Sequence, residues 1–82
     1  MISLRTRFDI HRDLGQWSIN RYAMELGFEP GDEQRFVAYL NGKHELTAKD
    51  ASFILTHHHF LQRGDELPSE IVDELEKIAA LS

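Results

Sequence analysis

The sequence predicts a small all-α domain, and three observations predict it. Apolar residues recur with the period of roughly 3.6 residues that marks amphipathic helices. No segment alternates with the period of two that marks a β-strand. Capping residues and glycines separate the helical segments. With 82 residues, the chain is long enough for one domain whose core is only just sufficient. We therefore expect residues 1–82 to form a single five-helix domain.

The first helix is expected over about residues 4–14. Leu4, Phe8 and Leu14 are expected to point inward. Thr6 and Asp9 have the spacing of a capping box, which would begin the helix one turn later.

The second helix is expected to begin after Ser18, which is a good N-cap residue, with Trp17 packing on its first turn. Gly27 follows the helix, at a position where a positive φ is common. Its apolar residues have the spacing of a single buried face: Ile19, Tyr22, Ala23 and Leu26.

The third helix is expected to begin after the N-cap Asp32 and to end at Asn41-Gly42. Its apolar residues are Phe36, Val37, Tyr39 and Leu40. Two short helices joined at a glycine, here over about residues 18–42, have the plan of a helix-turn-helix. The same plan also joins ordinary packed helices.

The last two helices have clear start signals. Thr47 and Asp50 form a capping box for the fourth helix, which is expected to end before Gly64. Its inward residues are expected to be Ala51, Ile54, Leu55, His58 and Leu61. Ser69 is expected to cap an acidic C-terminal helix over about residues 69–81. The predicted shared core consists of Ile19, Tyr22, Ala23, Leu26, Phe36, Leu40, Ala51, Ile54 and Leu55.

The charge distribution is uneven along the chain. The formal net charge is −5, which is unusual for a nucleic-acid binder because phosphate contacts need Lys and Arg. Residues 1–44 carry six cations and six acids, so the whole excess of acid lies in residues 45–82. The first half can therefore still present a basic face.

Composition also bears on the compartment and on the chemistry. The chain has no cysteine and no apolar run near the ~20 residues of a membrane span, and its first residues are too charged for a signal peptide. We expect a cytoplasmic protein that does not associate with membranes. The run His57-His58-His59 cannot converge on one metal ion, because consecutive helical residues point roughly 100° apart. No nucleophile–base pair or glycine-rich phosphate loop is present. We expect no enzyme activity, no cofactor and no metal.

One family has a similar order of motifs. Ala23, Leu26 and Gly27 are followed by the run Leu40-Asn41-Gly42-Lys43. After this run come Leu46-Thr47, Asp50-Ala51 and Ile54. This order resembles the lambda-repressor-like (Cro-type) helix-turn-helix domain of small phage and bacterial regulators. The chain departs from that family in a longer connection that contains Pro30-Gly31, and in Glu33 at the start of the third helix.

The resemblance implies a five-helix DNA-binding domain and a set of contact residues. Three would approach base edges in the major groove: Gln34, Arg35 and Ala38. Glutamine suits adenine and arginine suits guanine. Four would contact phosphates: Lys43, His44, Arg21 and Asn20.

Two functions from different classes follow. The first is a sequence-specific transcriptional regulator of the repressor type. It would act as a homodimer on a palindromic double-stranded DNA operator, with Ile71 to Leu81 in the dimer interface. The alternative is a protein-binding module, such as an antitoxin, an anti-activator or a phage-encoded inhibitor, that has the fold but does not bind DNA. In that case the acidic fourth and fifth helices would bind a basic protein partner through Glu45, Asp65, Glu66, Asp73, Glu74 and Glu76.

Overall fold

The protein is all-α. A computed structural model describes residues 2–58 and 66–81, and these residues form five helices and no strand, with 67% of them helical. The helices are α1 (Leu4–Gly15), α2 (Ile19–Glu25), α3 (Glu33–Leu40), α4 (Ala48–His57) and α5 (Ser69–Ala79). The all-helical prediction is confirmed, and every predicted helix is present.

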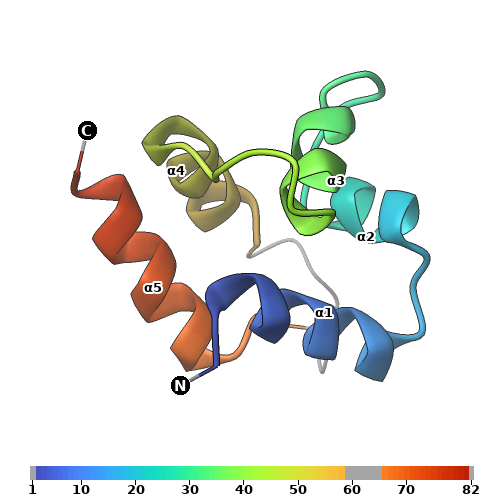
Figure 1. The fold of residues 1–82 in the computed structure, drawn as a ribbon, viewed down its shortest axis with the longest axis horizontal. Helices are drawn as coiled ribbons and strands as arrows, with labels where there is room; N and C mark the ends of the chain where they lie inside the picture. The colour runs from blue at the N-terminus through green and yellow to red at the C-terminus, as the bar shows by residue number, and fades with distance from the viewer. Residues whose placement is uncertain (1, 59–65, 82) are drawn as a thin grey trace.

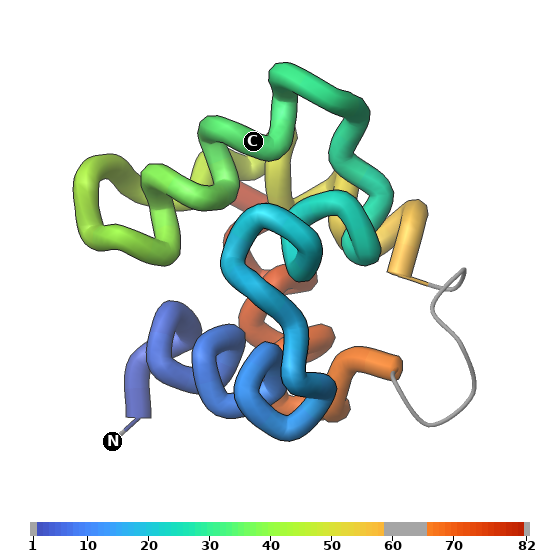
Figure 2. Tube along the Cα trace, turned by 90° about the vertical axis from the view of Figure 1, so that its right-hand side faces the viewer, coloured from blue at the N-terminus to red at the C-terminus, as the bar shows by residue number. Residues whose placement is uncertain are grey.

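The helices pack as two pairs connected by α1. The closest association is between α4 and α5, followed by α2 with α3, and α1 contacts both α3 and α5 (Figure 1). Figure 2 shows α1 running below α2 and α3, with α5 behind them. The α2–α3 pair and α5 therefore lie on opposite sides of the molecule (Figure 1).

The core is rich in aromatic rings. Phe8 of α1 makes edge-on contacts with Phe36, at a centroid distance of 5.1 Å, and with Tyr22 and Tyr39. Seven of the nine predicted core residues are buried. The other two, Ile19 and Leu55, are half-buried and pack against the core. The core also contains Phe8, Phe28, Tyr39, Leu46, Leu67, Ile71 and Leu75.

The ends of α1 differ from the prediction. Its N-cap is Ser3, whose Oγ accepts from the backbone N–H of Thr6, so the predicted Thr6–Asp9 capping box is wrong. The prediction that Leu14 points inward is also wrong, because it is 78% exposed. Leu14 is six residues after Phe8, and this separation turns it away from the core on a helix that advances roughly 100° per residue. The left-handed residue after the helix is Gln16, with φ 59°.

The start of α2 matches the prediction. Ser18 Oγ accepts from the backbone N–H of Arg21, and the Trp17 ring lies 5.4 Å from the Tyr22 ring, which places Trp17 against the first turn. Gly27 follows α2 with φ 103°, as expected. A Cβ at Gly27 would lie 2.7 Å from His57 Cβ, so a glycine is needed both for its φ and for the close approach of α4.

One predicted cap is wrong and two are confirmed in part. Asp32 is the residue before α3, as predicted, but its φ and ψ of −79° and −25° are helical and its side chain forms no capping hydrogen bond. Ser69 is already helical, and the extended Pro68 precedes it. Thr47 caps α4 by accepting from the backbone N–H of Asp50, but the Asp50 carboxylate points to another helix. His58 is half-buried at the end of α4, while Leu61 and Gly64 lie outside the described residues.

Candidate nucleic-acid interface

The exposed side of α3 is polar. Phe36, Tyr39 and Leu40 are buried and define the inner face of the helix. Because successive residues advance by roughly 100°, Gln34, Ala38 and Asn41 lie on the opposite side. Gln34 and Asn41 are exposed and Ala38 is half-buried. Both amides can donate and accept hydrogen bonds at once, as recognition of a base edge requires.

Arg35 is beside this face and is bound to α4. Its Nη2 lies 2.9 Å from Oδ1 of Asp50, as an ion pair rather than as an aligned hydrogen bond. The Asp50 side chain is 4% exposed, whereas the Arg35 side chain is 52% exposed. Asp50 is in the first turn of α4, where the helix dipole also favours a negative charge. One end of this ion pair is therefore fixed in the interior and the other is open to solvent.

The end of α3 positions Lys43. The backbone N–H of Lys43 donates to Ala38 O at 2.9 Å, and that of Gly42 donates to Tyr39 O at 3.0 Å. With Gly42 at φ 79°, these bonds form a Schellman motif, which ends the helix sharply. Lys43 and His44 are both exposed just beyond this end, and His44 Nδ1 lies 2.8 Å from Glu45 O.

The neighbouring α2 provides the remaining predicted contacts. Asn20 and Arg21 are both exposed on the outer side of α2. Arg21 Nε donates to Glu25 Oε1 at 2.7 Å, as an i,i+4 ion pair. In water such a pair contributes only a few tenths of a kcal/mol, so the guanidinium can exchange Glu25 for a phosphate at little cost.

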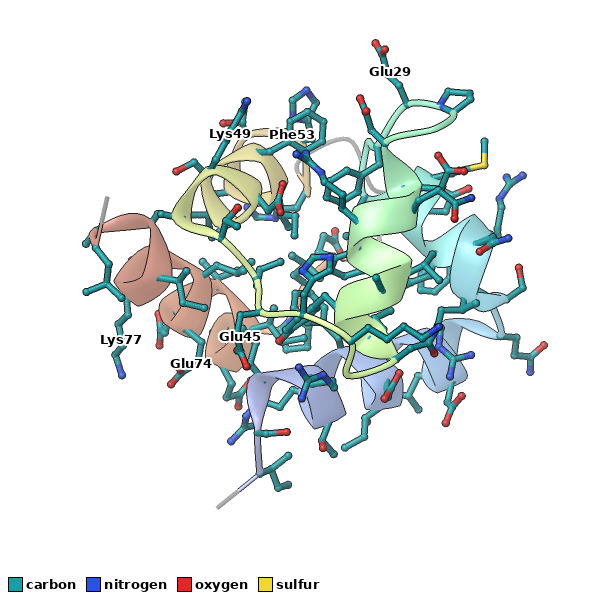
Figure 3. All side chains as sticks on the ribbon, turned by 45° about the horizontal axis from the view of Figure 1, so that its top comes forward. Glu29, Glu45, Lys49, Phe53, Glu74 and Lys77 are labelled. Carbon is teal, nitrogen blue, oxygen red and sulfur yellow. The ribbon has the colours of Figure 1, made fainter. Side chains whose placement is uncertain are left out.

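The surface of this helix pair is not basic. Residues 18–44 contain three Lys or Arg and four carboxylates. Two of the three cations, Arg21 and Arg35, are ion-paired. Glu29 lies at the outer end of the α2–α3 connection (Figure 3). A nucleic acid bound here would therefore be held by directional hydrogen bonds more than by overall attraction.

All seven predicted DNA-contact residues are on α2, on α3 or immediately after α3. Sequence reasoning did not identify the exposed Asn41 of this surface or the buried Asp50 that pairs with its Arg35. The helical period of α3 could have placed Asn41 beside Gln34 and Ala38. Asp50 gave no separate signal, because its spacing from Thr47 is also that of a capping box.

The described residues contain neither a metal site nor a membrane-spanning helix. In residues 2–58 and 66–81, no group of three His, Asp or Glu side chains could hold a metal ion. Within the same residues, no helix has the length and apolar character needed to cross a membrane. His59 of the histidine run lies outside the described residues.

Comparisons of the chain with protein-family models, with curated proteins and with solved structures found no match.

Proposed function

We propose that this protein is a sequence-specific DNA-binding regulator of the repressor type, with a lambda-repressor-like helix-turn-helix formed by α2 and α3. The observation that carries the proposal is the geometry of α3. One face of this helix packs on α2 and on the core, and the opposite face presents the amides of Gln34 and Asn41 to solvent. A helix exposed in this way fits the major groove.

The proposed contacts divide into two classes. Gln34 would pair with adenine and Arg35 with guanine, while Ala38 would lie against a thymine methyl group. Lys43, His44, Arg21 and Asn20 would contact phosphates and fix the position of the protein on the duplex. Arg21 and Arg35 are already paired with carboxylates, so few of these residues bring a net positive charge to the DNA. We therefore expect modest affinity for DNA of arbitrary sequence, and an affinity that depends only weakly on salt concentration.

A homodimer is part of the proposal, since a palindromic operator calls for two-fold symmetry. The structure limits which part of α5 can take part. Ile71 and Leu75 are buried in the core of the same chain, so they are not available to a second copy. Leu81 is 83% exposed beyond the end of α5, and Ile78 is half-buried near it. We therefore place the dimer contact at the C-terminal end of α5.

A second function has its own supporting observation. The ion pairs of Arg21 and Arg35 reduce the positive charge available at α2 and α3, and α5 is acidic and largely exposed on its outer side. The alternative is therefore a protein-binding module that would bind a basic partner protein through Glu45, Glu66, Asp73, Glu74 and Glu76, whereas Asp65 lies outside the described residues.

A salt titration separates the two functions. Duplex fragments from the native genomic neighbourhood are titrated with the protein at several salt concentrations, and binding is followed by fluorescence anisotropy. The DNA-binding function predicts affinity that falls as salt rises, and a salt slope that decreases by about one in Lys43→Ala. The matched control Lys77→Ala, on α5, should leave the slope unchanged. If the wild-type protein binds no duplex at low salt, the DNA-binding function is wrong and the acidic module remains.

A further inference from the structure

We infer that Asp50 is a positioning residue that holds Arg35 in the orientation needed to recognise a guanine. This inference rests on the proposed DNA-binding function and deepens it, because it assigns a role in guanine recognition to a residue outside the helix-turn-helix. It begins from the ion pair between Arg35 Nη2 and Asp50 Oδ1, which joins the exposed side of α3 to the first turn of α4.

The burial of the two partners is strongly asymmetric. The Asp50 carboxylate is 4% exposed, and its backbone N–H is bound to Thr47 Oγ1, so the residue is fixed both through its main chain and by its surroundings. The Arg35 side chain remains 52% exposed. The carboxylate therefore acts as a fixed anchor, and the guanidinium is its accessible end.

Arginine chemistry leaves donors for a base. A guanidinium has five N–H donors in one plane, and a contact to one carboxylate oxygen uses only part of them. The remaining donors can form two parallel hydrogen bonds to guanine N7 and O6. Because Asp50 already restricts the rotamers of Arg35, less conformational entropy is lost when the base is bound.

Asp50 also prevents a competing use of Arg35. If Arg35 turned away to a phosphate, it would leave a buried carboxylate without its counter-charge, which is strongly unfavourable. The pair as a whole is neutral and adds little general attraction to DNA. Arg35 should therefore contribute to base preference much more than to non-specific binding.

The test uses the full-length protein and a randomised duplex library. Duplexes selected by the wild type at low salt should share a guanine at one position in each half-site. Replacing that guanine by adenine, or by an analogue that lacks the N7 acceptor, should weaken wild-type binding by about tenfold to a hundredfold. In Asp50→Asn and in Arg35→Ala this preference should largely disappear. The double variant should lose no more than either single variant.

Two further variants separate positioning from folding. Asp73→Asn removes an exposed carboxylate of α5 and should leave the guanine preference intact. Arg35→Lys keeps the positive charge beside Asp50 but lacks the planar fork, so it should lose the preference while the protein remains folded. If Asp50→Asn does not fold, the Arg35→Lys result still tests the guanine contact on which the inference depends.

Three outcomes would overturn the inference. In the first, Asp50→Asn retains the guanine preference. In the second, Asp50→Asn weakens binding to all duplexes equally, which indicates a purely structural role. In the third, Arg35→Lys recognises guanine as well as the wild type does. These outcomes leave the proposed function standing. A wild type that binds no duplex overturns the proposed function and this inference together.

Discussion

His11 Nδ1 lies 2.8 Å from the hydroxyl oxygen of Tyr22, in the interior where α1 meets α2. His11 is 7% exposed and Tyr22 is fully buried. The Trp17 ring covers both, with centroids 5.5 Å from His11 and 5.4 Å from Tyr22. This polar contact within an aromatic cluster fixes how α1 sits on the α2–α3 pair, because a buried polar group is satisfied in only one arrangement.

Removing the Tyr22 hydroxyl should lower the stability of the fold. We expect Tyr22→Phe to reduce the free energy of unfolding by about 1–3 kcal/mol, because a buried nitrogen of His11 loses a hydrogen-bond partner. Urea unfolding followed by circular dichroism measures the change. Tyr39→Phe is the matched control. It should cost less, since Arg5 Nε donates to the backbone carbonyl of Tyr39, which the substitution retains. Equal losses in both variants would contradict the assigned role of the His11–Tyr22 contact.

Alkaline pH should unfold the protein through its two buried tyrosines. Burial raises the pKa of Tyr22 and raises the pKa of Tyr39 from 10.0 to about 12; for Tyr39 the nearby Arg5 partly opposes the effect of burial. Above pH 10 these tyrosines are still neutral in the folded protein but ionised in the unfolded chain. The unfolded state therefore binds fewer protons than the folded state. Stability is therefore unaffected below pH 10 and falls as pH rises above it, by about 1.4 kcal/mol per pH unit for each tyrosine.

Urea unfolding midpoints measured between pH 9 and pH 12 test this slope. Tyr39→Phe should make the decline shallower, and Tyr22→Phe should do the same from its own lower starting stability. A midpoint that stays constant above pH 10 in the wild type would be inconsistent with the raised pKa values.

Two leucines of opposite exposure test the core. Leu26→Ala should cost about 2–5 kcal/mol, because Leu26 is fully buried and its truncation leaves a cavity. Leu14→Ala is the same chemical change at a side chain that is 78% exposed, so it should leave the stability nearly unchanged. Thermal unfolding of both variants shows the contrast. Comparable losses would mean that the end of α1 packs differently from the structure.

Gly15 should be intolerant of alanine even though it is in a helix. An alanine normally stabilises a helix relative to glycine, but a Cβ at Gly15 would overlap the six-membered ring of Trp17. We expect Gly15→Ala to cost about 1–3 kcal/mol, the usual range for an overpacked site. In a Trp17→Ala background the same change should become neutral or stabilising. If Gly15→Ala stabilises the wild type, the Trp17 ring does not occupy this place.

The position of the proposed dimer contact can be tested by one charge. Leu81→Glu should convert a dimer into a monomer, because it places a carboxylate in an apolar contact. Leu14→Glu, at the exposed end of α1, is the control and should not change the mass. Analytical ultracentrifugation at micromolar concentration measures both variants. A wild type that is already monomeric on DNA would contradict the homodimer.

Local signals allowed prediction where the structure depends on local chemistry. The i, i+3, i+4, i+7 spacing of Ile19, Tyr22, Ala23 and Leu26 identified α2, because a helix of this length has one face to bury. Ser18 and Thr47 were identified as caps for a similar reason, since the cap bond joins residues three apart. The predicted core followed from the same periodicity.

Predictions failed where several residues offered the same local chemistry or where distant segments meet. Ser3 and Thr6 are both suitable caps, and in the folded protein Ser3 is the one that caps α1. The Asp50 carboxylate could bond the N-terminus of its own helix or pair with a cation elsewhere in the chain. In the folded protein α3 brings Arg35 next to it, and the two form an ion pair. That choice depends on tertiary structure, which helical periodicity does not contain.

Trp17 gives the protein a built-in fluorophore. It is the only tryptophan in the chain, and its indole lies against His11 and Tyr22 rather than against the proposed DNA-contact surface. Its emission therefore reports specifically on the junction of α1 with α2. A ligand bound at α3 would leave the spectrum unchanged unless it also shifts this junction, so steady-state fluorescence distinguishes rigid docking from a rearrangement of the whole fold without any attached dye.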